Sequence, residues 1–187
     1  MSTPRTTPRK RTAKNPAAAA LETAGSAPVA SAAAIVATAA PSATAVPLAS
    51  VPLAVRWGDL DAFNHVNNAT FLVYVQEARL AWLAQIEGAW FDETMMPVVA
   101  AVQMNYRRQL AWPAQIVVEL APTRVGNSSL TIAHRILAAD DPSCVYADGD
   151  VVMVWIDPSS GRSVALPDAI RSACQSSAEA LAATTSK

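Results

Sequence analysis

The sequence is poor in the residues that mark metal and cofactor sites. Its 187 residues include two histidines, two cysteines and six glycines. Cys144 and Cys174 form no C-x-x-C pair, and no H-x-x-x-H spacing occurs, so we expect no metal site. No glycine-rich phosphate loop is present, and we expect no cofactor. Two isolated thiols suit a reducing compartment, so we expect a cytoplasmic protein. We also expect both cysteines to have packing roles.

Long apolar runs and an excess of one charge are also lacking. No stretch approaches the roughly 18 apolar residues of a membrane span. The formal net charge is -1, so no strong field is directed at nucleic acid or an anionic membrane. We therefore predict no membrane span and no nucleic-acid partner.

The first fifty residues lack aromatic side chains, and Glu22 is their only acidic residue. Their basic start and Ala/Pro/Ser-rich remainder bury too little area to offset the entropy of ordering. We predict a disordered tail over residues 1–50, a domain over 51–176 and a flexible C-terminal tail over 177–187. Three other interpretations of the basic start stay open: a signal peptide, an organelle transit peptide, or weak contact with nucleic acid or acidic lipid.

From residue 51 onward, hydrophobic periodicity predicts regular elements. Apolar residues at helical spacing predict a helix over residues 69–87 that ends at Gly88, and Gly149 is expected to mark a β-bulge. Val73 and Leu80 are apolar on the face opposite the main stripe, which indicates that the helix is wrapped on most sides. The other expected elements are strands at 51–57, 98–106, 116–120, 130–137 and 145–156, a loop at 58–68 and a closing helix at 167–176. This order predicts an α+β fold in which an antiparallel sheet curls round one long helix.

A motif spans the expected loop and the start of the helix. It reads V-R-W-G-D-L-D-A-F-N-H-V-N-N-A-T-F over residues 55–71, with Q-E-A-R at 76–79. This pattern, together with residues 147–157 and Leu166-Pro167, resembles the 4-hydroxybenzoyl-CoA thioesterase-like family of hotdog-fold enzymes. The resemblance covers about residues 51–174. It implies a hotdog fold, acyl-CoA thioesterase activity and a homodimer or homotetramer.

The same resemblance implies a role for each motif residue. Asp61 corresponds to the catalytic carboxylate, and the backbone N–H of Asn68 to the oxyanion donor. The side chains of His65, Asn67 and Asn68 are expected to position thioester, water or loop. Asp59 is expected to hold the loop through hydrogen bonds. Two positions depart from the family pattern. Asn64 stands where glycine is frequent, and asparagine tolerates the left-handed backbone angles of such a site. Phe71 is expected to contact the substrate. It stands where the family commonly has tyrosine, so the tyrosine hydroxyl that could reach the substrate is missing.

The chemistry is reasonable on the residues alone. A thiolate leaves readily, because the pKa of a free thiol is only about 8.5. One carboxylate can therefore suffice, either by attacking the carbonyl or by deprotonating a water. Backbone N–H groups at a helix start can stabilise the oxyanion.

Alternative interpretations remain for the individual residues. Asp61 and His65 could simply shape the loop, and Asn67 and Asn68 could cap the helix. Glu77 is a rival carboxylate, for which pairing with Arg79 or a neighbouring subunit is the more ordinary role. Four arginines could bind CoA phosphates, but strand surfaces carry arginine routinely: Arg107, Arg108, Arg124 and Arg135. For the whole protein, the alternatives are a non-catalytic acyl-thioester binder and a thioesterase acting on acyl carrier protein.

Overall fold

The computed structural model describes residues 47–175. The rest of the predicted tails, residues 1–46 and 177–187, lies outside this range. The elements in chain order are β1 (Ala49–Ala54), η1 (Trp57–Asp59), α2 (Asn68–Leu83), β2 (Met96–Tyr106), β3 (Gln115–Val125), β4 (Ser129–Ala138) and β5 (Val145–Ile156). A helical segment over residues 168–175 follows.

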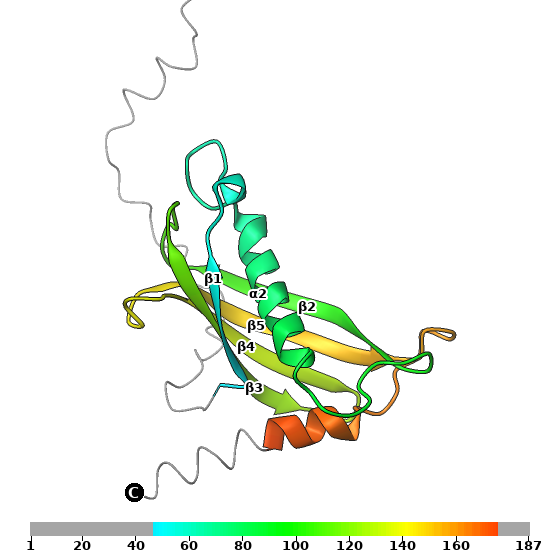
Figure 1. The fold of residues 1–187 in the computed structure, drawn as a ribbon. Coiled ribbons are helices and arrows are strands. Elements are labelled where there is room, and N and C mark those ends of the chain that lie inside the picture. The colour runs from blue at the N-terminus through cyan, green and yellow to red at the C-terminus, as the bar shows by residue number, and fades with distance from the viewer. Residues whose placement is uncertain (1–46, 176–187) are drawn as a thin grey trace, which may run out of the picture. The chain divides into compact units, whose positions relative to one another are not determined.

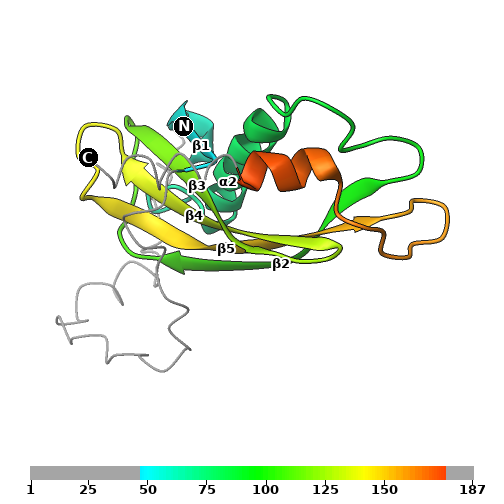
Figure 2. The same cartoon turned by 90° about the horizontal axis from the view of Figure 1, so that it is seen from below.

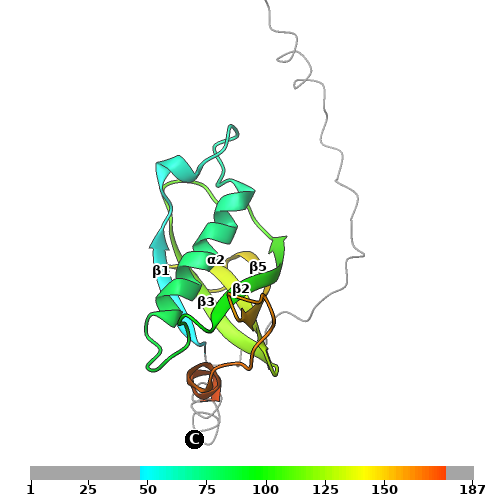
Figure 3. The same ribbon diagram turned by 90° about the vertical axis from the view of Figure 1, so that its right-hand side faces the viewer.

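The strands form one antiparallel sheet in the order β1-β3-β4-β5-β2, and α2 lies across one face of it (Figure 1). Figure 2 shows the sheet nearly edge-on, with α2 and the C-terminal helical segment on the same side. In Figure 3 the C-terminal segment lies near one end of α2. This arrangement confirms the predicted α+β fold, with the sheet curled round a single long helix.

The core lies between α2 and the concave face of the sheet. The sequence predicts a stripe of Phe71, Val75, Ala78, Trp82 and Ile86. The helix contributes the first four, all buried, whereas Ile86 lies beyond the end of α2 and is only partly buried. Alternate residues of β3, β4 and β5 face this stripe, as period two requires: Ile116, Val118, Leu120, Leu130, Ile132, Ile136, Val151, Met153 and Trp155. The Trp155 indole N–H donates to the Trp90 carbonyl at 2.8 Å, which joins the loop after α2 to the sheet.

Several strand boundaries differ from the prediction. β1 begins at Ala49, which pairs with Leu120 on β3, so sheet structure starts before the expected residue 51. The strand ends at Ala54, and Trp57 belongs to the short η1 turn instead. β3 continues past the expected Leu120 to Val125. Its register shifts between Pro122 and Arg124, which lets the strand pass a proline that cannot donate to the ladder.

The predicted end of α2 is wrong by four residues. The helix ends at Leu83 rather than at residue 87. Beyond it, the amides of Gln85 and Ile86 donate to the third residue back, Trp82 and Leu83, in the tighter 3₁₀ pattern. Gly88 has the positive φ of 99° that was expected of a glycine stop, but it lies in the turn after the helix.

The predicted alternation of β2 is interrupted by a bulge between Val99 and Ala101. One extra residue reverses which side chains face the core. Val99 pairs with buried Met153 and so faces α2, whereas the simple alternation placed Val98 and residue 100 there. The predicted bulge at Gly149 is wrong, because its pairing is regular on both sides. A Cβ at this position would overlap the Gln103 carbonyl oxygen, so close strand approach accounts for the glycine.

Candidate active site

The loop between η1 and α2 is held by backbone hydrogen bonds. Leu60 and Val66 form an isolated antiparallel bridge. The Val66 amide donates to the Leu110 carbonyl at 2.7 Å, which fixes the loop to the connection between β2 and β3. Asn64, which stands where the family frequently has glycine, adopts a left-handed backbone with a φ of 60°. The loop is therefore a folded turn with a defined backbone.

Asp59 supports this loop from within. It is 7 % exposed and accepts hydrogen bonds from the Arg56 amide at 2.8 Å and the Tyr74 hydroxyl at 2.7 Å. The Arg56 guanidinium pairs with its other oxygen at 3.0 Å. Burial acts to raise the pKa of Asp59, but the hydrogen bonds from Arg56 and Tyr74 together hold it below its usual value. Asp59 therefore stabilises the loop, as predicted.

Asp61 uses one carboxylate oxygen to shape the turn. Its Oδ1 accepts from the amides of Phe63 at 2.8 Å and His65 at 3.3 Å. No residue of the described range donates to Oδ2. Asp61 therefore has the ordinary turn-shaping role, and its other oxygen has no partner in the described part of the chain.

The start of α2 leaves one backbone donor unused. The Asn67 side chain caps the helix, accepting from the Ala69 amide at 2.9 Å, and the Asn67 amide donates to the Asp59 carbonyl at 2.9 Å. The Thr70 amide donates to the Asn67 carbonyl. The Asn68 N–H lies between these engaged amides, and it donates to no acceptor among residues 47–175. Helix starts present such orphan donors to anions.

An open cavity of about 300 Å³ gathers most of the predicted site residues. Asp61, His65, Asn68 and Phe71 all line it. Asn67 is not among the lining residues, and its contact with substrate stays a prediction.

The strand opposite supplies residues that the motif did not include. The Tyr106 hydroxyl donates to the Asn68 carbonyl at 3.0 Å, and its ring meets Phe71 edge-on at 5.3 Å. Arg107 and Arg108 follow it along the cavity wall. The Arg107 guanidinium donates two hydrogen bonds to Asp148, at 2.7 and 3.0 Å. Of the two cations, Arg108 is therefore the one more available to a ligand. The sequence places Tyr106, Arg107 and Arg108 at the end of a predicted half-buried strand. That position alone does not predict that the strand end lies beside the Asp61 loop.

Other predicted candidates lie elsewhere. Glu77 does not line the cavity, and its carboxylate lies 3.9 Å from Arg56 rather than pairing with Arg79. Arg135 pairs with Glu119 across β3 and β4 at 3.3 Å. Within the described residues, no three His, Cys, Asp or Glu side chains gather as they would around a metal ion. None of the helices in the described part is long and apolar enough to cross a membrane.

Comparison with known proteins identifies the family. The model of the thioesterase-like superfamily matches residues 55–174, about two thirds of the chain. The chain belongs to this superfamily. It resembles a candidate acyl-CoA thioesterase of Xanthomonas campestris (XC229), with 50 % identity, a TM-score of 0.56, and coverage of 60 % of this chain and 95 % of the other. The chain is also similar to a Thermus thermophilus thioesterase complexed with coenzyme A and Zn, at 32 % identity, a TM-score of 0.60, and coverage of 70 % and 94 %.

A third relative is the long-chain acyl-CoA thioesterase FadM of Escherichia coli, 27 % identical over 64 % of this chain and 91 % of the relative. These matches confirm the predicted thioesterase family and hotdog fold. They also support the assignment of the chain as a thioester hydrolase.

Proposed function

We propose that the protein hydrolyses acyl-CoA thioesters, with Asp61 as the reacting carboxylate and the Asn68 amide as oxyanion donor. One observation carries this proposal. Asp61 Oδ2 and the Asn68 backbone N–H have no hydrogen-bond partner within residues 47–175, and both residues line the same cavity. The helix start adds a favourable dipole for a developing negative charge.

The reaction joins a water to the thioester and releases a carboxylate and a thiol. As general base, Asp61 takes a proton from water while the water oxygen forms a bond to the carbonyl carbon. As nucleophile, Asp61 forms that bond itself, and water later hydrolyses the mixed anhydride. On either route the carbonyl oxygen becomes an oxyanion beside the Asn68 amide. The C–S bond then breaks, and the thiolate takes up a proton.

The surroundings suit the rest of an acyl-CoA. Arg108 supplies a cation at the cavity wall for a CoA phosphate, since the Arg107 guanidinium is engaged with Asp148. His65 lines the cavity and can donate to thioester or water. The coenzyme A complex of the Thermus thermophilus relative supports this choice of substrate class.

We further propose that the active form is a homodimer or a higher homo-oligomer in the cytoplasm. β2 is the longer of the two edge strands of the sheet, with eleven residues against six in β1, and such edges invite pairing with another chain. Leu80 on α2 is 54 % exposed and Val99 on β2 is 48 % exposed. A second copy placed along β2 would cover these side chains, which accounts for the apolar second face of the helix. The two unpaired cysteines support a reducing compartment.

The test is a thiol-release assay with a disulfide reagent on a panel of aliphatic and aromatic acyl-CoAs. We expect enzyme-dependent release of CoA with at least one of them. Saturable binding of an acyl-CoA without thiol release on any substrate would contradict the proposal and identify a binding protein. Much faster release from acyl carrier protein than from the matching acyl-CoA would contradict the CoA assignment.

A further inference from the structure

Arg79 on α2 is buried, and no described residue forms an ion pair with it. It is 7 % exposed, and no carboxylate or carbonyl among residues 47–175 accepts a hydrogen bond from its guanidinium. The other buried or paired arginines differ. Arg56, Arg107 and Arg135 each meet a carboxylate, and Arg171 donates to two backbone carbonyls.

An unpaired buried guanidinium is costly, because desolvation is not compensated by an opposite charge. Burial accordingly lowers the pKa of Arg79. Its titratable neighbour on the sheet side is His134, whose pKa is lowered to about 4, first by burial and then by the charge of Arg79. Asp148 acts on His134 in the opposite direction, but its carboxylate is already bound by Arg107 and Asn105. The described protein therefore offers no spare anion to Arg79.

Arg79 lines a second cavity, of about 310 Å³. The rest of its wall is mostly apolar: Leu80, Leu83, Phe91, Met96 and Val99 are among its members. The β2 bulge turns Val99 toward this cavity, and Arg79 is the one charged residue in the lining. An apolar chamber with a single cation suits a ligand that is apolar along its length and anionic at one end.

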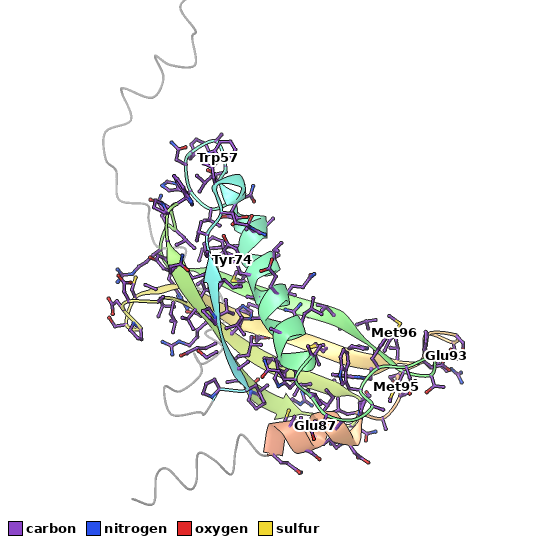
Figure 4. The ribbon with its side chains drawn as sticks, viewed as in Figure 1. Trp57, Tyr74, Glu87, Glu93, Met95 and Met96 are labelled. Atoms are coloured by element: carbon purple, nitrogen blue, oxygen red, sulfur yellow. The ribbon has the colours of Figure 1, made fainter. Side chains whose placement is uncertain are left out.

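The two cavities lie toward opposite ends of α2 and β2. The first uses Asn68 and Tyr106, and the second uses Leu83 and Met96. Figure 4 shows Trp57, just before the Asp61 loop, at one end of the molecule and Met96 toward the other. From Asn68 to Arg79 the helix rises about 16 Å, and an arginine on a helix leans back toward its N-terminus, which shortens the gap. The gap that remains after the arginine side chain reaches back is comparable to the length of an extended medium-length acyl chain.

We propose that the second cavity receives the far end of the acyl chain and that Arg79 binds a terminal carboxylate there. The substrate class is then the mono-CoA thioester of a medium-chain dicarboxylic acid. A carboxylate fits the planar guanidinium with two parallel hydrogen bonds and neutralises its charge. This inference rests on the proposed thioesterase activity and adds the identity of the acyl group.

The experiment compares kcat/KM for matched pairs of thioesters: butyryl- with succinyl-CoA, hexanoyl- with adipoyl-CoA, octanoyl- with suberoyl-CoA, and decanoyl- with sebacoyl-CoA. We expect the wild type to prefer the dicarboxylic member of at least one longer pair by roughly 10- to 100-fold, the range of one charge-assisted hydrogen-bond pair. Arg79→Met should remove that preference and retain hydrolysis of the monocarboxylic member. Arg124→Met, which removes an exposed charge outside both cavities, should keep the preference.

Three results would overturn the inference. The first is a wild type that hydrolyses the monocarboxylic member equally well or better in every pair. The second is an equal fall for both members in Arg79→Met. The third is dissociation of an oligomer in Arg79→Met, seen by light scattering, because a second copy would then supply the anion. Competitive inhibition of the wild type by suberate and octanoate gives the same comparison without any variant, and octanoate binding as tightly as suberate would refute the proposal. Absence of thiol release from every thioester would instead refute the proposed function.

Discussion

Asp59 and Asp61 are two residues apart and both accept hydrogen bonds, yet their hydrogen bonds predict different effects of substitution on stability. Asp59→Asn should destabilise the fold strongly, and Asp61→Asn only slightly. The Asp59 carboxylate accepts on both oxygens, with the Arg56 amide and the Tyr74 hydroxyl on Oδ2 and the Arg56 guanidinium on Oδ1. An asparagine replaces one of these oxygens with an N–H₂ group that faces a donor. Asp61 accepts through Oδ1 alone, and an asparagine oxygen retains that acceptor.

The expected magnitude comes mainly from Tyr74. Its hydroxyl is buried and bonded to a charged oxygen at 2.7 Å. A hydrogen bond to a charged group contributes about 1.5–3 kcal/mol, and a buried donor left unsatisfied costs a further 1–3 kcal/mol. The exposed Arg56 guanidinium adds little, because water screens it. We expect Asp59→Asn to lower the free energy of unfolding by about 2–4 kcal/mol, and Asp61→Asn by about 1 kcal/mol or less.

Urea unfolding followed by tryptophan fluorescence measures both variants. The Asp59 effect should also depend on pH, because its pKa is held below its usual value in the folded protein. Its stabilisation is present above the unfolded pKa of about 4 and is lost as the pH falls through the lowered folded value. The difference between wild type and Asp59→Asn should therefore shrink below about pH 4. Equal destabilisation by the two substitutions at pH 7 would refute the division of roles.

Three further substitutions, at two positions, test the helix start and the buried histidine. Asn67→Ala removes the cap of α2 and should cost about 1 kcal/mol of unfolding free energy in urea titrations, whereas Asn67→Ser should restore most of it. Loss of stability in Asn67→Ser equal to that in Asn67→Ala would contradict the capping role. Both ring nitrogens of His134 are buried without a partner among the described residues, so His134→Leu should be neutral or stabilising at pH 7. The pKa of His134 is about 4 in the folded protein and about 6.5 in the unfolded chain. The stability of the wild type should therefore decrease as the pH falls from about 6.5 to about 4, and the stability of His134→Leu should decrease less. An unchanged pH slope in that variant would contradict a neutral buried His134.

The helices and strands of this fold can be predicted from the sequence more accurately than the residues at which they begin, end or bulge. The stripe of Phe71, Val75, Ala78, Trp82 and Ile86 is a local pattern, and its four members within α2 are buried as expected. The bulge in β2 depends on pairing with β5, so no alternation within residues 96–106 reveals it. The early end of α2 likewise depends on where the following loop packs.

The candidate site divides in the same way. Asp61, His65, Asn68 and Phe71 stand in one continuous motif, and the structure brings all four to one cavity. Tyr106 comes from a strand 38 residues after Asn68, and only the folded sheet brings the two together. The lack of an anionic partner for Arg79 among the described residues could not be predicted from the sequence. Glu77, two residues away, is a plausible partner by sequence, but in the folded helix its carboxylate lies near Arg56.

The most direct test of the central claim is steady-state hydrolysis by Asp61→Asn on the best acyl-CoA substrate. Binding of a non-hydrolysable thioether analogue is measured in parallel. We predict a fall in kcat of on the order of 10²–10⁴, with the analogue bound nearly as tightly as by wild type, because the substitution removes the reacting carboxylate and keeps the turn. Wild-type kcat in the folded variant would contradict the assignment of Asp61.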